Sequence, residues 1–115
     1  MMRITEKVYE IMSFKEATKD RLISELLRAY RGKPLQVDID YYYRVISIKE
    51  SSEKIDRPSI KIKTAHNHVV ITFFPAKYIT WITDLVSAFL KSTEAGKSLF
   101  FQYAQHGNID ATLYL

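Results

Sequence analysis

The sequence contains no cysteine and only three glycines in 115 residues. The absence of cysteine excludes disulfide bridges, thiolate metal ligands and cysteine nucleophiles. The few glycines leave no glycine-rich loop for phosphate, and the two Gly-Lys pairs, at 32–33 and 96–97, follow predicted helices instead of preceding them. A Gly-x-Ser-x-Gly nucleophile elbow is also missing. Enzymes that depend on a cysteine nucleophile, a glycine-rich phosphate loop or a Gly-x-Ser-x-Gly elbow are therefore excluded.

Long apolar runs and blocks of like charge are missing as well. No run reaches the roughly 18 apolar residues of a membrane-spanning helix, and the charged N-terminal stretch lacks the apolar centre of a signal peptide. The net charge of +4 comes from 17 Lys and Arg against 13 Asp and Glu, and nowhere do five like charges follow one another. We expect a cytoplasmic protein that does not bind membranes and whose charge permits an acidic partner without requiring one.

The residues that are present suffice for a single domain over residues 1–115. This is an ordinary domain length, and a hydrophobic content of 47% supports a core that needs no disulfide bridge or metal ion to stabilise it. Residues 69–74 form a continuous apolar run typical of a covered strand, and after Pro75 a helix is predicted over residues 76 to about 94. The apolar stripe of this helix is formed by Tyr78, Ile82, Leu85 and Phe89.

An earlier helix is indicated by its start and stop signals. Ser13 to Glu16 is a Ser-x-x-Glu capping box, in which each side chain satisfies a backbone donor of the other residue. We therefore predict a helix that begins at Phe14 and ends before Gly32, where a left-handed residue is wanted. Residues 3–12 suit a strand or a helix equally well, because they mix helical apolar spacing with β-branched side chains.

The remaining segments alternate as strands do. Residues 35–49 alternate first, which places Tyr41 and Tyr43 on the inner face, and then slip near Arg44, where a bulge or burial on both faces is expected. Residues 50–58 form a polar loop, and the turn before the central strand lies at His66-Asn67, where asparagine tolerates a positive φ. The predicted strands after this loop and after the second helix are 59–64, 99–104 and 109–115.

Adjacent strands joined by short turns indicate hairpins, and hairpins build antiparallel sheets. We therefore predict an α+β fold with two layers, a mainly antiparallel sheet and two helices on one of its faces. The predicted order of elements is (β)-α-β-β-β-α-β-β.

No group of residues forms a recognisable catalytic or metal site, so we expect no enzyme activity and no cofactor. His66 and His68 are the one metal-like pair, but the turn between them should splay their rings, and no carboxylate stands nearby as a third ligand. Asp38 and Asp40 share a strand face as paired carboxylates do, and we interpret them as a solvated surface.

Two classes of partner remain after these exclusions. A protein partner is favoured, because Tyr42 and Trp81 are residue types that dominate protein interfaces. Nucleic acid is the alternative, since basic side chains around one strand could follow a phosphate backbone. The residues of that alternative are Lys49, Lys54, Arg57, Lys61 and Lys63.

We therefore expect a small non-catalytic protein-binding domain that acts through a sheet or an aromatic surface, as an inhibitor, adaptor or immunity-type module. Acidic residues stand in the same third of the chain as the basic group and would weaken any field directed at phosphate. The sequence leaves the oligomeric state open, a homodimer included.

Overall fold

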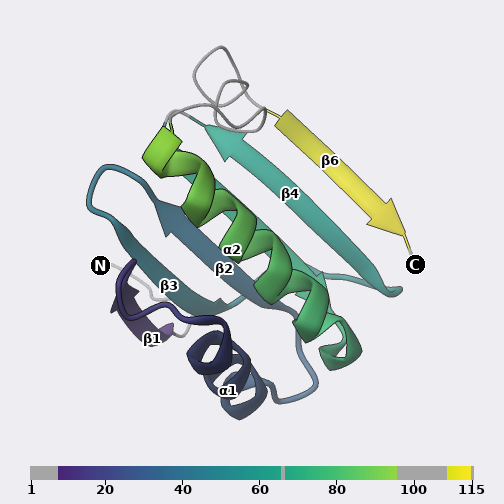
Figure 1. The fold of residues 1–115 in the computed structure, drawn as a ribbon. Helices are drawn as coiled ribbons and strands as arrows, with labels where there is room; N and C mark the ends of the chain where they lie inside the picture. Colours follow the sequence, from purple (N-terminus) through teal and green to yellow (C-terminus); the bar gives the residue numbers. More distant parts are fainter. Residues whose placement is uncertain (1–7, 66, 96–108, 115) are drawn as a thin grey trace, which may run out of the picture.

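The computed structural model of the chain describes residues 8–65, 67–95 and 109–114. In this part of the chain, two helices lie on one face of an antiparallel sheet of six strands (Figure 1). The predicted α+β class and the alternation of strands and helices along the chain are thereby confirmed. In chain order the elements are β1 (Val8–Ser13), α1 (Lys19–Ala29), β2 (Leu35–Asp40), β3 (Val45–Glu50), β4 (Ser59–Ala65), β5 (His68–Phe74), a 3-10 turn (Ala76–Tyr78), α2 (Ile79–Ala95) and β6 (Ile109–Tyr114).

The strands lie side by side in the order β1-β3-β2-β5-β4-β6, and every neighbouring pair is antiparallel. The hairpins β2–β3 and β4–β5 therefore join through a pairing of β2 with β5. This arrangement makes β1 and β6 the two edges of the described sheet. The terminal strand is thus part of the sheet, as its alternation predicts. The predicted strand at 99–104 lies outside the described residues.

The core lies between the sheet and the helices. In the middle of the sheet, Val37 on β2 stands between Ile48 on β3 and Ile71 on β5, and all three side chains are fully buried. Helix α2 runs over these central strands (Figure 1) and buries Ile82 and Val86 against them. Such an alternating apolar face forms because successive residues of a strand point to opposite sides of the sheet.

The segment 35–49 differs from its prediction in one respect. It forms two strands, β2 and β3, instead of one irregular strand, and residues 41–44 make the turn between them. Arg44 adopts a φ of 56°, and Tyr43 is 72% exposed, so the inner position predicted for Tyr43 is wrong. Tyr41 is buried as predicted. The alternation slips at Arg44 because of a turn and not a bulge. The four turn residues shift the alternation by one position, so that Ile46 and Ile48 of β3 point to the core together with Ile39 and Val37 of β2.

The predicted capping box is present, but the helix begins later. The Glu16 backbone N–H donates to Ser13 Oγ at 3.3 Å, and the Ser13 N–H donates to Glu16 Oε1 at 3.2 Å. These bonds close a turn, after which Thr18 caps α1 by accepting from the Arg21 N–H at 3.2 Å. The predicted start at Phe14 is therefore wrong by five residues. At the other end, Gly32 has the predicted positive φ, 81°.

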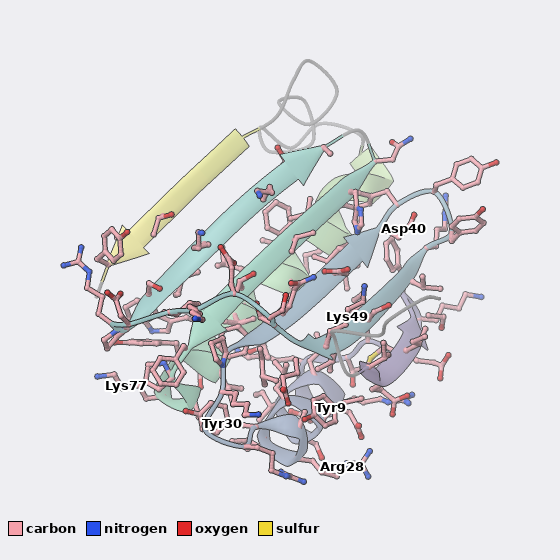
Figure 2. All side chains as sticks on the ribbon, turned by 180° about the vertical axis from the view of Figure 1, so that it is seen from behind. Tyr9, Arg28, Tyr30, Asp40, Lys49 and Lys77 are labelled. Atoms are coloured by element: carbon pink, nitrogen blue, oxygen red, sulfur yellow. The ribbon has the colours of Figure 1, made fainter. Side chains whose placement is uncertain are left out.

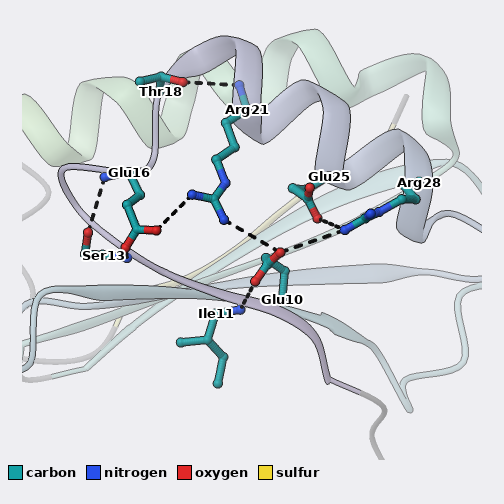
Figure 3. A network of polar contacts seen from close by, with 8 residues as sticks. All are labelled: Glu10, Ile11, Ser13, Glu16, Thr18, Arg21, Glu25 and Arg28. Carbon is teal, nitrogen blue, oxygen red and sulfur yellow. Dashed lines mark hydrogen bonds and ion pairs between the residues drawn. The ribbon is translucent and has the colours of Figure 1, made fainter.

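Ion pairs tie the edge strand β1 to α1, as Figure 3 shows. Glu10 of β1 lies 3.8 Å from Arg21 and 3.9 Å from Arg28, both on α1. Arg21 also binds Glu16 at 2.9 Å, and Arg28 binds Glu25 at 2.6 Å. The ambiguous stretch 3–12 thus resolves as a strand from residue 8 onward, because its pairing with β3 and this charge network are both tertiary contacts.

Truncation of Ile71 should test the central layer. Ile71→Ala is expected to lower the free energy of unfolding by about 2–5 kcal/mol, because the cavity left among packed neighbours adds to the lost burial. Val70→Ala is the matched control, since Val70 is the next residue of β5, points to the opposite face and is only partly buried. Urea denaturation measures both values. Equal losses in the two variants would contradict the assignment of the faces.

The capping box should make stability depend on pH. Hydrogen bonding to Ser13 and then to Arg21 lowers the pKa of Glu16. A carboxyl with a lowered folded-state pKa stabilises the fold above its unfolded-state pKa, and this contribution is lost as the pH falls through the folded-state pKa. Glu16→Gln should therefore destabilise the protein at pH 7, and the difference from the wild type should shrink as the pH falls below about 4.3, the unfolded-state pKa of glutamate, and through the folded-state pKa. Stability curves that stay parallel from pH 7 to acid pH would contradict this role.

Candidate functional site

An apolar groove lies beside α2, on the helix-bearing face of the sheet. Trp81 and Leu85 of α2 form its wall, Ile60 and Ile62 of β4 form its floor, and Leu113 of β6 forms its outer rim. The cavity measures about 440 Å³. Asp84 and Thr112 are the two polar residues that line it.

The groove exists because α2 lies over the middle of the sheet. With its side chains a helix is about 10–12 Å wide, whereas strands are spaced about 4.8 Å apart, so one helix covers roughly two strands. In Figure 1, β4 and β6 extend beyond α2, and no described helix covers them. Ile60 is buried under the edge of α2, but Trp81 and Leu113 are 53% and 54% exposed. Two large apolar side chains therefore meet solvent across a continuous apolar floor.

Trp81 is held in place by its neighbour on the preceding turn. The rings of Tyr78 and Trp81 lie 5.7 Å apart between centroids and are tilted by 45°. Tyr78 itself is buried, so one side of the Trp81 ring rests on the core while the other faces the groove. A rigid, half-exposed indole of this kind is a favoured anchor in protein interfaces.

The other predicted aromatic residue, Tyr42, lies at the tip of the β2–β3 hairpin. Tyr42 and Tyr43 are 74% and 72% exposed, and their rings meet edge to face at 4.9 Å. Asp40 Oδ1 accepts hydrogen bonds from the backbone N–H groups of Tyr42 and Tyr43 at 2.9 and 3.0 Å. The turn is thereby fixed, so the two tyrosines form a second exposed aromatic surface.

These two surfaces are separate. The hydroxyl of Tyr41, at the base of the hairpin tip, donates to the carbonyl oxygen of Phe89 at 3.1 Å. Phe89 follows Trp81 by eight residues, about 12 Å along the helix axis. The structure therefore does not bring Tyr42 and Trp81 together, although the sequence assigned both to one kind of surface.

Of the basic residues of the nucleic-acid alternative, Lys49 lies on the open face, the helix-free side of the sheet seen in Figure 2. Lys61 and Lys63 point to the same face, because they alternate along β4 with Ile60 and Ile62, which face the groove. Glu53 of the 51–58 loop binds Lys61, and Asp38 Oδ2 accepts from Lys49 Nζ at 2.8 Å. The guanidinium of Arg57 stacks 3.6 Å from the centroid of the Tyr114 ring. Lys54 is exposed on the same loop, and Lys63 stands opposite Asp110 in the register of β4 with β6. The open face therefore mixes both signs of charge.

Asp38 is not the solvated acid that its position predicts. It is 8% exposed, and besides Lys49 it accepts a hydrogen bond from Gln36 Nε2 at 2.8 Å. His68 Nε2 lies 3.9 Å from the same carboxylate. Asp40 has a different function, because it closes the hairpin turn. The two carboxylates therefore stabilise structure separately and do not form a pair.

Two further observations concern groups that could take part in chemistry. Within residues 8–65, 67–95 and 109–114, no three His, Cys, Asp or Glu side chains gather as metal ligands would, and His66 lies outside these ranges. Tyr9, near the β1 edge, donates to Glu50 at 2.9 Å, and this bond to a carboxylate raises the pKa of Tyr9. Tyr9 belongs to β1, the edge strand opposite to β6, so it lies far from the groove.

Sequence analysis identified Trp81 but missed the residues that face it. Ile60, Ile62 and Leu113 alternate as ordinary strand residues, and nothing in their spacing shows that β4 and β6 are neighbours beyond α2. Leu85 was assigned to the core stripe of the helix, where it is only partly buried. The usable signal was the position of Trp81 at the border of that stripe.

Comparison with protein-family models, with curated proteins and with solved structures gave no match. None of the described helices combines the length and the apolar character that crossing a membrane requires. The geometry of the groove, the hairpin tip and the open face is therefore the basis for the function proposed below.

Removing Lys49 should destabilise the open face. Lys49→Ala removes one of the two side-chain donors of the buried Asp38 carboxylate and leaves Gln36, which is expected to lower the free energy of unfolding by roughly 1–3 kcal/mol. The double variant Asp38→Asn/Lys49→Met should recover most of this loss, because it removes both charges together. Urea denaturation at pH 7 compares the three proteins. Equal stability of the single and the double variant would show that Asp38 does not need its partner.

Proposed function

We propose that this chain is a non-catalytic protein-binding domain, an inhibitor, adaptor or immunity-type module, and that it binds its partner through the groove beside α2. The observation that supports this most strongly is the pairing of Trp81 with Leu113 across an apolar floor. Contiguous exposed apolar surface with a polar rim is a feature of protein interaction sites.

The residue types in the groove suit a protein partner. Interface hot spots are enriched in tryptophan and lie in apolar pockets that exclude water on binding. The wall of the groove is rigid, because Trp81 rests on the buried Tyr78, so little side-chain entropy would be lost on binding. The exposed Tyr42 and Tyr43, at the tip of the β2–β3 hairpin, offer a further and separate contact surface for a large partner.

The charges on the open face favour a protein partner over the nucleic-acid alternative. A protein that follows a phosphate backbone needs cations that are free to replace counterions. Lys49 and Lys61 instead bind Asp38 and Glu53, and Arg57 stacks on Tyr114. Binding of phosphate there would first require some of these contacts to break.

Substitution of Trp81 tests the proposal directly. Proteins captured from the native host by the wild-type chain are compared with those captured by Trp81→Ala, and the retained partner is then purified and titrated. Trp81→Ala is expected to raise the dissociation constant of the complex with this partner roughly 30-fold, which corresponds to the ~2 kcal/mol of a hot spot. Because Trp81 is half exposed, the variant should keep its fold, and its thermal transition confirms this.

Salt dependence separates the two classes of partner. Protein binding through an apolar groove should change only modestly between 50 and 200 mM salt. If the five basic residues each neutralised a duplex phosphate, the slope of log K against log salt would approach about −4. Sub-micromolar binding to an oligonucleotide that is lost in Lys61→Glu/Lys63→Glu and kept in Trp81→Ala would overturn the proposal.

A further inference from the structure

We infer that the partner presents an amphipathic α-helix, which lies in the groove as an additional helix next to α2. This inference rests on the proposed function and names the kind of structure that the groove accepts. It is derived from the width of the sheet that no described helix covers, from the chemistry of the lining and from the cation at one end of the groove.

The part of the sheet that no described helix covers has the width of one helix. α2 covers the middle of the sheet, and β4 and β6 form two more strand widths beyond it (Figure 1). Two strands spaced about 4.8 Å apart match a helix that packs about 8–10 Å from its neighbour. Trp81 and Leu85 then stand where the side of a neighbouring helix would contact α2. The six residues of β6 extend about 20 Å, the length of roughly 14 helical residues.

The lining favours a helix over a small molecule. Small-molecule sites enclose their ligand and place several polar groups around it to fix its orientation. Here the polar lining consists of Asp84 and Thr112, and Asp84 is already bound to Lys19 at 2.7 Å. The groove also lies open past Leu113, at the edge of the described sheet. An apolar helix face with anchors at positions i, i+3, i+4 and i+7 needs no polar contacts there.

The helix-bearing face also favours a helix over an added strand. A strand would pair with the free edge of β6, in the plane of the sheet, and would draw its affinity from backbone hydrogen bonds. It would leave Trp81 and Leu85, which stand above the sheet, without a partner. A helix in the groove contacts the wall and the floor together.

A cation stands at the end of the groove where α2 begins. Lys77 lies over the ring of Tyr78 at 5.1 Å, and Tyr78 contacts Trp81. Lys77 is exposed, so the wall of the groove carries a positive charge at this end. We expect the bound helix to place an acidic side chain there, because opposite charges at the rim of an interface fix its register. Arg57 does not contribute to this charge, because Tyr114, on which it stacks, alternates with Leu113 and points to the open face.

The experiment compares two peptide libraries on the full chain. Both display 14-residue peptides of the same composition, one with apolar residues at helical spacing and the other with strict alternation. Each is sorted for binding to the wild type and against Leu113→Glu, whose substituted side chain is exposed at the rim. The helical library is expected to yield binders and the alternating library none. Enrichment of the alternating library, or of neither library, overturns the inference.

The selected peptides are then tested with the intrinsic fluorescence of Trp81, the one tryptophan of the chain. Binding should shift its emission to the blue, and Leu113→Ala should weaken the dissociation constant roughly five- to tenfold. Tyr42→Ala is the matched control and should bind as the wild type does. Replacing the acidic end of the peptide by lysine should weaken binding to the wild type and less so to Lys77→Glu.

Other occupants of the groove give different results and would each overturn the inference. A second copy of the chain would shift Trp81 emission with protein concentration alone, in step with the oligomeric state. An occupant from within the chain would protect Trp81 from acrylamide quenching at every concentration. If the native partner needs Trp81 but is not displaced by the selected helices, the helix inference fails while the proposed function stands. If no native partner depends on Trp81, the proposed function fails.

Discussion

The structure depends on the apolar layer between α2 and the central strands. Val37, Ile48 and Ile71 stand side by side on three neighbouring strands and are fully buried, and Ile82 and Val86 of α2 cover this part of the sheet. Their burial contributes to the driving force that holds the sheet together, since hydrophobic stabilisation grows with the apolar area removed from water. The edges are held by weaker contacts, among them the ion pairs that join Glu10 of β1 to α1.

The central position of α2 also accounts for the groove. Two helices and six strands do not match in width, so the strands at one edge keep an apolar face that no described helix covers. On the opposite face of the same sheet, Lys49 binds Asp38 and Lys61 binds Glu53. No buried side-chain polar atom of the described residues lacks a hydrogen-bond partner. The difference between the two faces therefore directs attention to the apolar side as the place where another molecule would bind.

Local signals in the sequence predicted local structure well. Ser13 and Glu16 form the reciprocal bonds of a capping box, Gly32 and Asn67 adopt the positive φ expected of them, and Tyr41 is buried. Each of these features depends on residues that are close in the chain or on simple alternation. The wrong predictions arose where the same local signal fits two different structures. The capping box closed a turn before α1 began at Lys19, and the slip at Arg44 produced a hairpin that turned Tyr43 outward.

The sequence by itself determined the class of the fold, the positions of most helices and strands and the presence of Trp81 at the border of a helical stripe, because periodicity and capping act within a few residues. Only the tertiary structure decided that β6 pairs with β4, so that Leu113 faces Trp81 across Ile60 and Ile62. It also decided that Asp38 is buried against Lys49 and that Tyr42 lies away from Trp81. The order of strands in a sheet is set by long-range packing, and alternation of side chains within each strand is the same whichever strand becomes its neighbour.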